Sequence, residues 1–260
     1  MTPRAESTAS KRKSTESDLE VTLAANTGPS DKIFKVLTSQ LVRIIVGPEE
    51  DTQTEFLVYE NLLCARCPFF KKALQGSFKE ASEKRVVLRE EDPEIFSSFL
   101  YWLHAGRLVP FTEKGKEAGQ DMMKYIKLWI LGDRFQVTTI QNCAMDEIRA
   151  GAKKHNIYFD VPQLRHIYEN TMPGATLRYN AVDFMCWHMV RRQNVDHLYR
   201  DAIHEIPGLG TDAAFSFRKL CEVDTTYGRI PMPGHLSSSY HIVDVASDKE
   251  SPSKKKSRPS

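Results

Sequence analysis

Residues 91–106 read Glu-Asp-Pro-Glu-Ile-Phe-Ser-Ser-Phe-Leu-Tyr-Trp-Leu-His-Ala-Gly, and this stretch carries the signals for both ends of a helix. Asp92 has the side chain of a helix N-cap, and Pro93 suits the first helical position because its missing N–H would have no intrahelical partner there. The apolar side chains that follow recur at helical spacing: Ile95, Phe96, Phe99, Leu100 and Leu103. Gly106 ends the pattern. The stretch therefore predicts a helix that buries one face.

Three short apolar segments precede this helix and predict β-strands. Residues 41–47 (LVRIIVG) are rich in β-branched side chains and run into Gly-Pro, which is typical of a strand followed by a turn. Residues 56–59 predict a second strand after a polar turn, so the two segments form a predicted hairpin. Residues 86–88 predict a third, shorter strand.

Two short helices are predicted between the second and third strands. Asn61 is placed to cap a helix over residues 61–66, and Pro68 suits the first position of the next one. The apolar face of that next helix has four members: Phe69, Phe70, Ala73 and Leu74. After Gly106, a polar loop over residues 112–120 precedes helices predicted over residues 122–131 and 138–150.

The composition indicates an ordinary globular protein with polar ends. The chain has 260 residues, 41% of them hydrophobic and 27% charged, with a net charge of +2. This near balance disfavours nucleic acid as a direct ligand, because phosphate binding needs a basic surface. No apolar run has the roughly 18 residues of a membrane helix, and we expect no signal peptide, because the first residues lead into Ser, Thr and Glu rather than an apolar stretch. Five scattered cysteines fit a reducing compartment, so we expect an intracellular protein, in the nucleus or cytoplasm.

Both ends of the chain are predicted to be disordered tails. Residues 1–30 and 236–260 are rich in polar and charged side chains that offer little to bury. Each tail has a short basic cluster of the kind that nuclear import receptors bind: Lys11, Arg12 and Lys13, then Lys254, Lys255, Lys256 and Arg258. The alternative is that these lysines and arginines only keep the tails solvated.

The order of the predicted elements and several linked segments resemble the BTB/POZ domain family. The segments are residues 61–70 (NLLCARCPFF), 76–80 (GSFKE), 86–88 (VVL) and 91–106, within a resemblance that covers residues 36–150. The resemblance implies an α+β fold in which a short three-stranded sheet is flanked by helices. We expect this BTB/POZ domain at residues 31–150, followed by an all-α region at residues 151–235.

Two positions depart from the family pattern. Tyr59-Glu60 stands where the family often has His-Lys after the second strand, and Leu41-Val42-Arg43 lacks an Asp that often precedes the first. In transcriptional-repressor members, those polar residues help to form a charged groove for corepressors. The departures argue against that kind of partner for this chain.

The region after the domain is similar to the C-terminal part of many fungal BTB proteins over residues 157–192. Two helices are predicted there, with apolar stripes that we interpret as core rather than as a ligand groove. The first stripe is Val161, Leu164, Ile167 and Tyr168, and the second is Leu177, Ala181, Phe184, Met185, His188 and Met189. A third helix over residues 212–221 is expected to carry Phe215, Phe217 and Leu220.

Phe78 and Glu80 are the candidate partner-binding residues. In BTB adaptors of cullin-type ubiquitin ligases, an apolar-x-Glu motif before the third strand touches the cullin, and the resemblance assigns that motif to Phe78-Lys79-Glu80. An exposed ring beside a carboxylate suits a protein contact, because the ring fills a pocket and the charge fixes orientation. The alternative is that Phe78 only covers the core beneath its loop.

Redox, metal and catalytic sites find weaker support. Cys64 and Cys67 have the spacing of redox or zinc sites, and Cys67 at a helix N-terminus would have a lowered thiol pKa, but a second zinc-binding pair is missing. Cys186 and His188 are two positions apart on a predicted helix and point in different directions. Glycine-rich phosphate loops and Gly-x-Ser-x-Gly elbows are absent from the sequence. We therefore expect no enzyme activity, no metal and no cofactor.

The sequence thus favours a protein–protein interaction module, namely an adaptor that self-associates or links a cullin-type ligase to a substrate. The alternative is a nuclear chromatin- or transcription-associated factor in which the BTB domain only mediates dimerisation. The sequence contains no zinc finger or basic leucine zipper that would favour this alternative.

Overall fold

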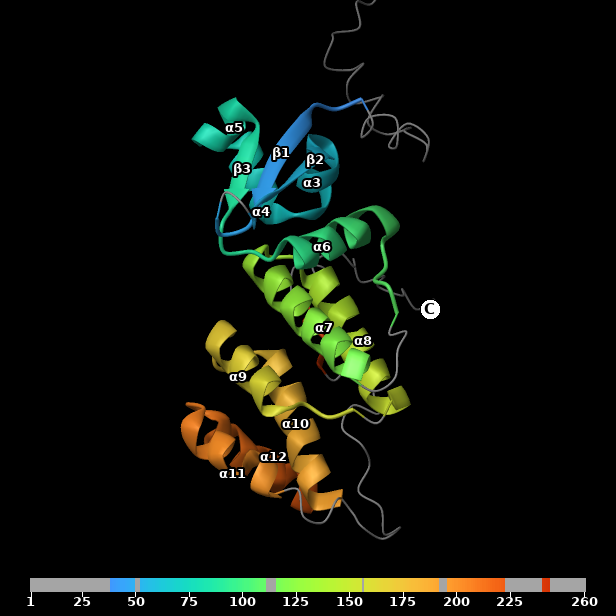
Figure 1. Cartoon of the computed structure of the whole chain (residues 1–260), viewed down its shortest axis with the longest axis vertical. Coiled ribbons are helices and arrows are strands. Elements are labelled where there is room, and N and C mark those ends of the chain that lie inside the picture. Colours follow the sequence, from blue (N-terminus) through green and yellow to red (C-terminus); the bar gives the residue numbers. More distant parts are fainter. Residues whose placement is uncertain are drawn as a thin grey trace, which may run out of the picture.

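The computed structural model describes residues 38–49, 52–110, 116–155, 157–191, 196–222 and 240–243. A small sheet and its helices occupy one end of the molecule, a long helical hairpin lies in the middle, and four helices form the other end (Figure 1). The predicted α+β fold, with a three-stranded sheet flanked by helices and a helical region after it, is confirmed. Among the described residues, no helix is both long enough and apolar enough to cross a membrane.

The sheet has the order β2-β1-β3 and mixes both pairing modes. β1 (Leu41–Val46) pairs antiparallel with β2 (Thr54–Tyr59) and parallel with β3 (Arg85–Leu88). Along β1, Val42, Ile44 and Val46 are fully buried while the intervening side chains face outward, as the two-residue period of a strand requires. All three strands begin within two residues of their predicted positions.

Three short helices connect β2 to β3: α3 (Glu60–Arg66), α4 (Pro68–Gln75) and α5 (Lys79–Glu83). The prediction that Asn61 caps α3 is wrong. The helix already begins at Glu60, and the Asn61 N–H instead donates to the Ser39 hydroxyl over 3.3 Å. α5 was not predicted at all. Lys84 follows α5 as its C-cap and has a left-handed backbone with φ of 48°.

The stretch that decides the fold behaves as predicted. α6 (Pro93–Ala105) begins where the Asp92 carboxylate accepts the Glu94 N–H over 2.9 Å, and it ends at Gly106 with φ of 69°. Its buried face adds Trp102 to the predicted stripe, while Leu100 is half-buried. The helix thereby joins the sheet to the helices that follow.

An aromatic cluster fills the space between α4, α6 and the end of the next helix. Its members are Phe69, Phe70, Phe96, Phe99 and Phe135. The Phe135 ring lies in the middle, stacked on Phe69 with centroids 4.9 Å apart and edge-on to Phe99 at 5.4 Å. This cluster holds the sheet end of the molecule against the central hairpin.

The central hairpin consists of α7 (Lys116–Arg134) and α8 (Thr138–His155). The predicted loop over residues 112–120 is wrong in its last five positions, because α7 already includes residues 116–120. In the last turn of α7, a Cβ on Gly132 would lie only 2.7 Å from the Ile140 Cγ2 atom. Glycine there allows the two helices their close approach.

The C-terminal end contains α9 (Val161–Asn170), α10 (Thr176–Arg191), α11 (Asp196–Glu205) and α12 (Leu209–Glu222). α11 was not predicted. A capping box of Asp160 and Gln163 fixes the start of α9. The predicted stripes of α9 and α10 are core residues, but α10 is buried on nearly every side rather than along one stripe.

Arg178 is a buried cation at the centre of this region. Only 6% of it is exposed, and it points back to the end of α9. Its Nη2 donates to the Tyr168 carbonyl over 2.7 Å and to the Thr171 carbonyl, while Nε donates to the Thr171 hydroxyl over 2.9 Å. The guanidinium also lies 4.5 Å above the Tyr168 ring. A cation thus satisfies the carbonyl groups that a helix leaves unpaired at its C-terminus.

Candidate protein-binding site

Phe78 stands out from the surface where α4 gives way to α5. It is the residue just before α5, its backbone is extended, and 61% of it is exposed. The alternative that Phe78 covers the core is therefore wrong. The ring lies over Gly76, where an added Cβ would come within 3.1 Å of the ring and 2.5 Å of the Lys72 carbonyl oxygen. The missing side chain at residue 76 lets the chain turn tightly and present the ring.

Glu80 lies in the first turn of α5, half-buried beside Phe78. A carboxylate suits this position because the exposed N–H groups of a helix N-terminus carry partial positive charge. Phe78 and Glu80 also line one groove of about 390 Å³ that lies over α4 and β3. The structure thus brings the two predicted contact residues together.

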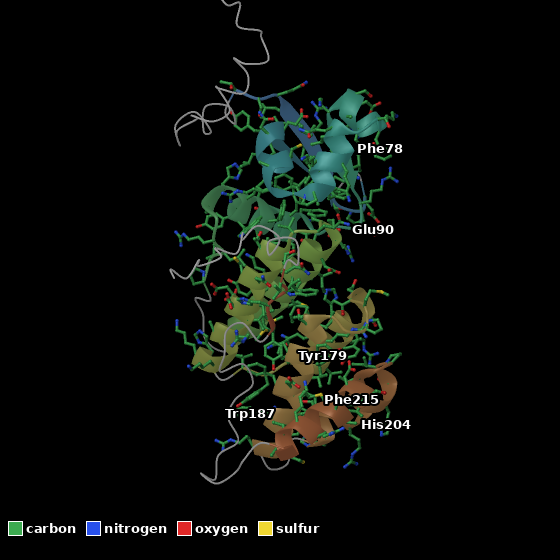
Figure 2. The ribbon with its side chains drawn as sticks, turned by 180° about the vertical axis from the view of Figure 1, so that it is seen from behind. Phe78, Glu90, Tyr179, Trp187, His204 and Phe215 are labelled. Atoms are coloured by element: carbon green, nitrogen blue, oxygen red, sulfur yellow. The ribbon has the colours of Figure 1, made fainter. Side chains whose placement is uncertain are left out.

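The groove continues past β3 toward α7. A second section of about 410 Å³ shares Phe69, Val87, Leu88 and Arg134 with the first. Phe78 and Glu90, at the two ends of this path, lie along the same side of the molecule (Figure 2). Because β3 pairs only with β1 among the described residues, the groove follows an open sheet edge with apolar walls. Sequence reasoning found Phe78 and Glu80 but missed the groove, which is built from segments far apart in the chain.

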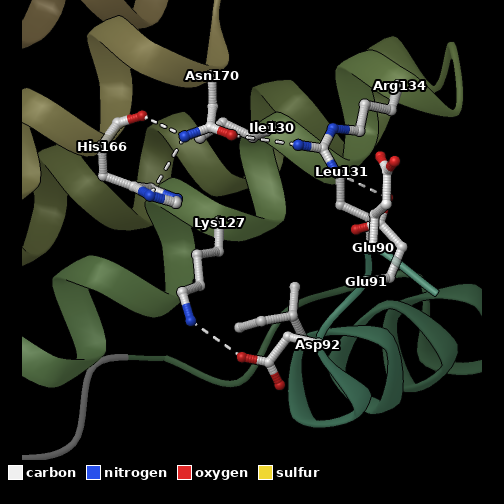
Figure 3. A pocket seen from close by; sticks show the side chains of 10 residues that line it. Glu90, Glu91, Asp92, Lys127, Ile130, Leu131, Arg134, His166 and Asn170 are labelled. Atoms are coloured by element: carbon white, nitrogen blue, oxygen red, sulfur yellow. Dashed lines mark hydrogen bonds and ion pairs between the residues drawn. The ribbon is translucent and has the colours of Figure 1, made fainter. Parts of the chain in front are cut away.

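A polar pocket of about 190 Å³ ends this path where α6, α7 and α9 meet. Lys127 pairs with Asp92 over 2.9 Å, and Arg134 donates to Glu91 over 3.0 Å and to the Asn170 side chain over 3.2 Å (Figure 3). Burial lowers the pKa of His166, and the nearby Lys127 charge lowers it further. The two ion pairs join α7 to the start of α6, and the contact of Arg134 with Asn170 extends this network to α9.

Glu60, one of the two departures from the family pattern, takes part in an ion pair. Its carboxylate lies 2.9 Å from the Lys84 Nζ, which also donates to the Leu74 carbonyl over 3.3 Å. The acidic residue therefore ties α3 to the left-handed residue at the end of α5. This contact helps to hold the segment that carries Phe78.

Burial dominates the surroundings of both thiols of the cysteine pair. Cys67 is buried and donates its S–H to the Phe135 carbonyl over 3.7 Å, and burial raises its pKa to about 11. The prediction of a lowered pKa is wrong, because desolvation outweighs the helix N-terminus. Burial also raises the pKa of Cys64, whose S–H donates to the Phe70 carbonyl.

Cys186 and His188 point apart, as predicted. The Cys186 thiol donates to the Ala213 carbonyl on α12, and the His188 ring meets the Tyr199 hydroxyl on α11 at 3.2 Å. Within the described ranges, no three His, Cys, Asp or Glu side chains converge as metal ligands. The basic clusters predicted for nuclear import, at residues 11–13 and 254–258, lie outside the described residues.

Comparison with known proteins identifies the sheet end and the central hairpin. Residues 42–149 match the model of the BTB/POZ domain. The chain is also similar to a BTB/POZ domain-containing protein of Acanthamoeba polyphaga mimivirus, with 30% identity over 112 residues. That match covers 40% of this chain and 20% of the viral protein, so the chain spans about a fifth of the relative's length. The family match ends before α9, and the resemblance of residues 157–192 to fungal proteins stays a prediction.

Proposed function

Because residues 42–149 form a BTB/POZ domain, a protein-interaction domain, we propose that this chain is an adaptor that links a cullin-type ubiquitin ligase to a second protein. The cullin binds at Phe78 and Glu80, and the groove along β3 receives adjoining parts of it. The observation that carries the proposal is the exposed Phe78 ring beside Glu80 at the mouth of an apolar groove.

The energetics of such a contact favour Phe78 as its centre. Full burial of an exposed phenylalanine side chain contributes about 1.5–3 kcal/mol, and Phe78 begins 61% exposed. A gain of about 2 kcal/mol corresponds to roughly 30-fold in affinity. Glu80 adds orientation, because its half-buried carboxylate lines the groove and can accept hydrogen bonds from a partner bound there.

The test is capture of a cullin by the intact chain. We expect the cullin to co-purify, and Phe78→Ala with Glu80→Lys to abolish its capture while the melting temperature stays within about 2 °C, since Phe78 is exposed and Glu80 is only half-buried. Phe215→Ala is the matched control, because Phe215 is also 61% exposed but lies on α12, outside the BTB/POZ domain. Cullin capture that survives the double substitution would refute this binding site.

We also propose that the domain self-associates through the outer face of its sheet. Leu41 and Leu57 are 46% and 61% exposed on β1 and β2, and they share this face with the exposed Arg43–Glu55 ion pair. Burial of such a patch against a second copy would remove it from water.

A further inference from the structure

A short segment near the C-terminal end of the chain lies across helices that are distant from it in sequence. We call residues 240–243 (Tyr-His-Ile-Val) the strap. Its seat consists of Asn142, Asp146 and Arg149 on α8, Asp183 on α10, and Ser216 and Lys219 on α12. The seat is remote in sequence from Phe78 and from β3.

Asn142 binds the main chain of the strap as a neighbouring strand would. Its side-chain amide donates to the Ile242 carbonyl over 3.0 Å, and its oxygen accepts the Ile242 N–H over 2.8 Å. This paired contact uses only main-chain atoms of the strap and so requires no particular side chain at that residue. It is the part of the seat that peptides of different sequence can use.

The side chains of the strap add selectivity. The Tyr240 hydroxyl donates to Asp183 Oδ2 over 2.7 Å, and its buried ring lies 5.9 Å from the Arg149 guanidinium. Burial raises the pKa of Tyr240, with Asp183 adding to the effect, so this hydroxyl stays a donor. Ile242 packs against the hydrophobic core.

His241 lies between Tyr240 and Ile242, and its contact is more exposed. The His241 Nε2 lies 2.8 Å from Asp146 Oδ1, with 27% of the histidine side chain and 50% of the aspartate side chain exposed. The seat therefore selects a tyrosine and, two residues later, an aliphatic side chain.

The two carboxylates of the seat keep partners when the strap is absent. Asp183 Oδ1 accepts from the Ser216 hydroxyl over 2.6 Å, and Lys219 lies 3.8 Å from Oδ2. Asp146 retains Arg149, at 3.7 Å. An emptied seat consequently leaves no isolated buried charge, which is the usual reason that such a site cannot open.

We propose that the seat is a peptide-binding site, filled in cis by the strap, whose partner in trans is a protein segment carrying Tyr-x-Ile, or Tyr-x followed by a similar aliphatic residue. The inference goes beyond cullin binding, because it gives the C-terminal helices a binding site of their own. The strap acts as a competitor. A tethered segment has an effective concentration on the order of 1 mM. If the strap sequence binds the seat with a Kd of about 100 µM, the tethered strap weakens the apparent affinity of a competing peptide roughly tenfold.

The experiment uses the full chain and a fluorescent peptide of residues 237–246 (SSSYHIVDVA), with binding measured by fluorescence anisotropy. We expect the Y240A/I242A chain, whose own strap is disabled, to bind the peptide about tenfold tighter than the unaltered chain does. Adding Asn142→Ala to that variant should weaken binding about tenfold, since it removes two main-chain hydrogen bonds.

Tyr240→Phe keeps the ring in the core and removes only the hydroxyl. This variant should show a smaller gain in the same direction, even if the double variant fails to fold. Asn142→Ala alone should retain cullin capture, which keeps a failure of this site separate from a failure at Phe78. No saturable binding by either strap variant, in chains with the circular dichroism of the unaltered protein, would overturn the proposal. Equal binding with and without Asn142 would overturn it too.

Discussion

Replacing Arg178 by methionine should destabilise the C-terminal helices strongly. Methionine keeps much of the volume and length of the side chain but cannot donate hydrogen bonds. The substitution leaves the Tyr168 carbonyl, the Thr171 carbonyl and the Thr171 hydroxyl without the donors that Arg178 supplies. It also removes the cation above the Tyr168 ring.

The magnitude follows from opposing contributions. Hydrogen bonds from a charged donor contribute about 1.5–3 kcal/mol each, but they are not additive within one group. Removing the guanidinium also relieves the cost of keeping it out of water. We expect a net loss of about 3 kcal/mol, which lowers the melting temperature of a chain of this size by roughly 6–12 °C.

Thermal unfolding followed by far-ultraviolet circular dichroism measures this loss. Arg191→Met is the matched control on the same helix, because Arg191 also lies over a ring, 5.7 Å from Trp187, but is exposed. Its loss should stay under about 1 kcal/mol. Arg178→Lys should fall between the two, since it keeps the charge but loses the fork of donors. If Arg178→Met melts like Arg191→Met, the proposed role of the buried guanidinium is wrong.

Two further predictions concern thiol reactivity and assembly. Iodoacetamide at pH 8 should label exposed Cys221 well before Cys67, because burial raises the Cys67 pKa to about 11. Mass spectrometry of the labelled chain measures the order of labelling. Early labelling of Cys67 would contradict its burial. Equilibrium sedimentation should show a dimer at a protein concentration of tens of micromolar. Leu57→Lys should shift the equilibrium toward monomer, because it places a charge on the outer face of the sheet. A monomer in the unaltered protein would refute self-association.

The sequence predicts those elements whose signals are local. The α6 boundaries follow from Asp92, Pro93 and Gly106, because a cap and a left-handed glycine act within one turn. α5 lacks such signals. Its five residues, KEASE, have no apolar face, and the helix is held instead by contacts of neighbouring residues such as the Lys84–Glu60 pair.

Phe215 shows why a hydrophobic residue alone is a weak guide to burial. Phe215 and Phe217 are two positions apart and cannot share one face of a helix. The buried face of α12 uses Leu209, Ala213 and Ser216 at helical spacing, which leaves Phe215 61% exposed. Small side chains allow α12 to approach α10 closely, and this does not appear as a hydrophobic stripe in the sequence.

In the candidate site too, some residues can be predicted from the sequence and others cannot. Phe78 and Glu80 are neighbours in sequence, so a motif could identify them. The walls of the groove come from Phe69, Val87 and Arg134, which only the tertiary fold brings together. The strap is more remote still, since its contacts depend on residues that precede it by dozens of positions.

The separation between Asn142 and Ile242, 100 residues, also has a consequence for how the protein is made. The last residue of the seat, Lys219, precedes Ile242 by 23 residues, so at about 5–20 residues per second ribosomes add Ile242 roughly 1–5 s after the seat is complete in sequence. During this interval the seat has no strap to receive. Every newly synthesised molecule therefore passes through a stage in which the seat is open, and a partner that meets the nascent chain does not have to displace anything.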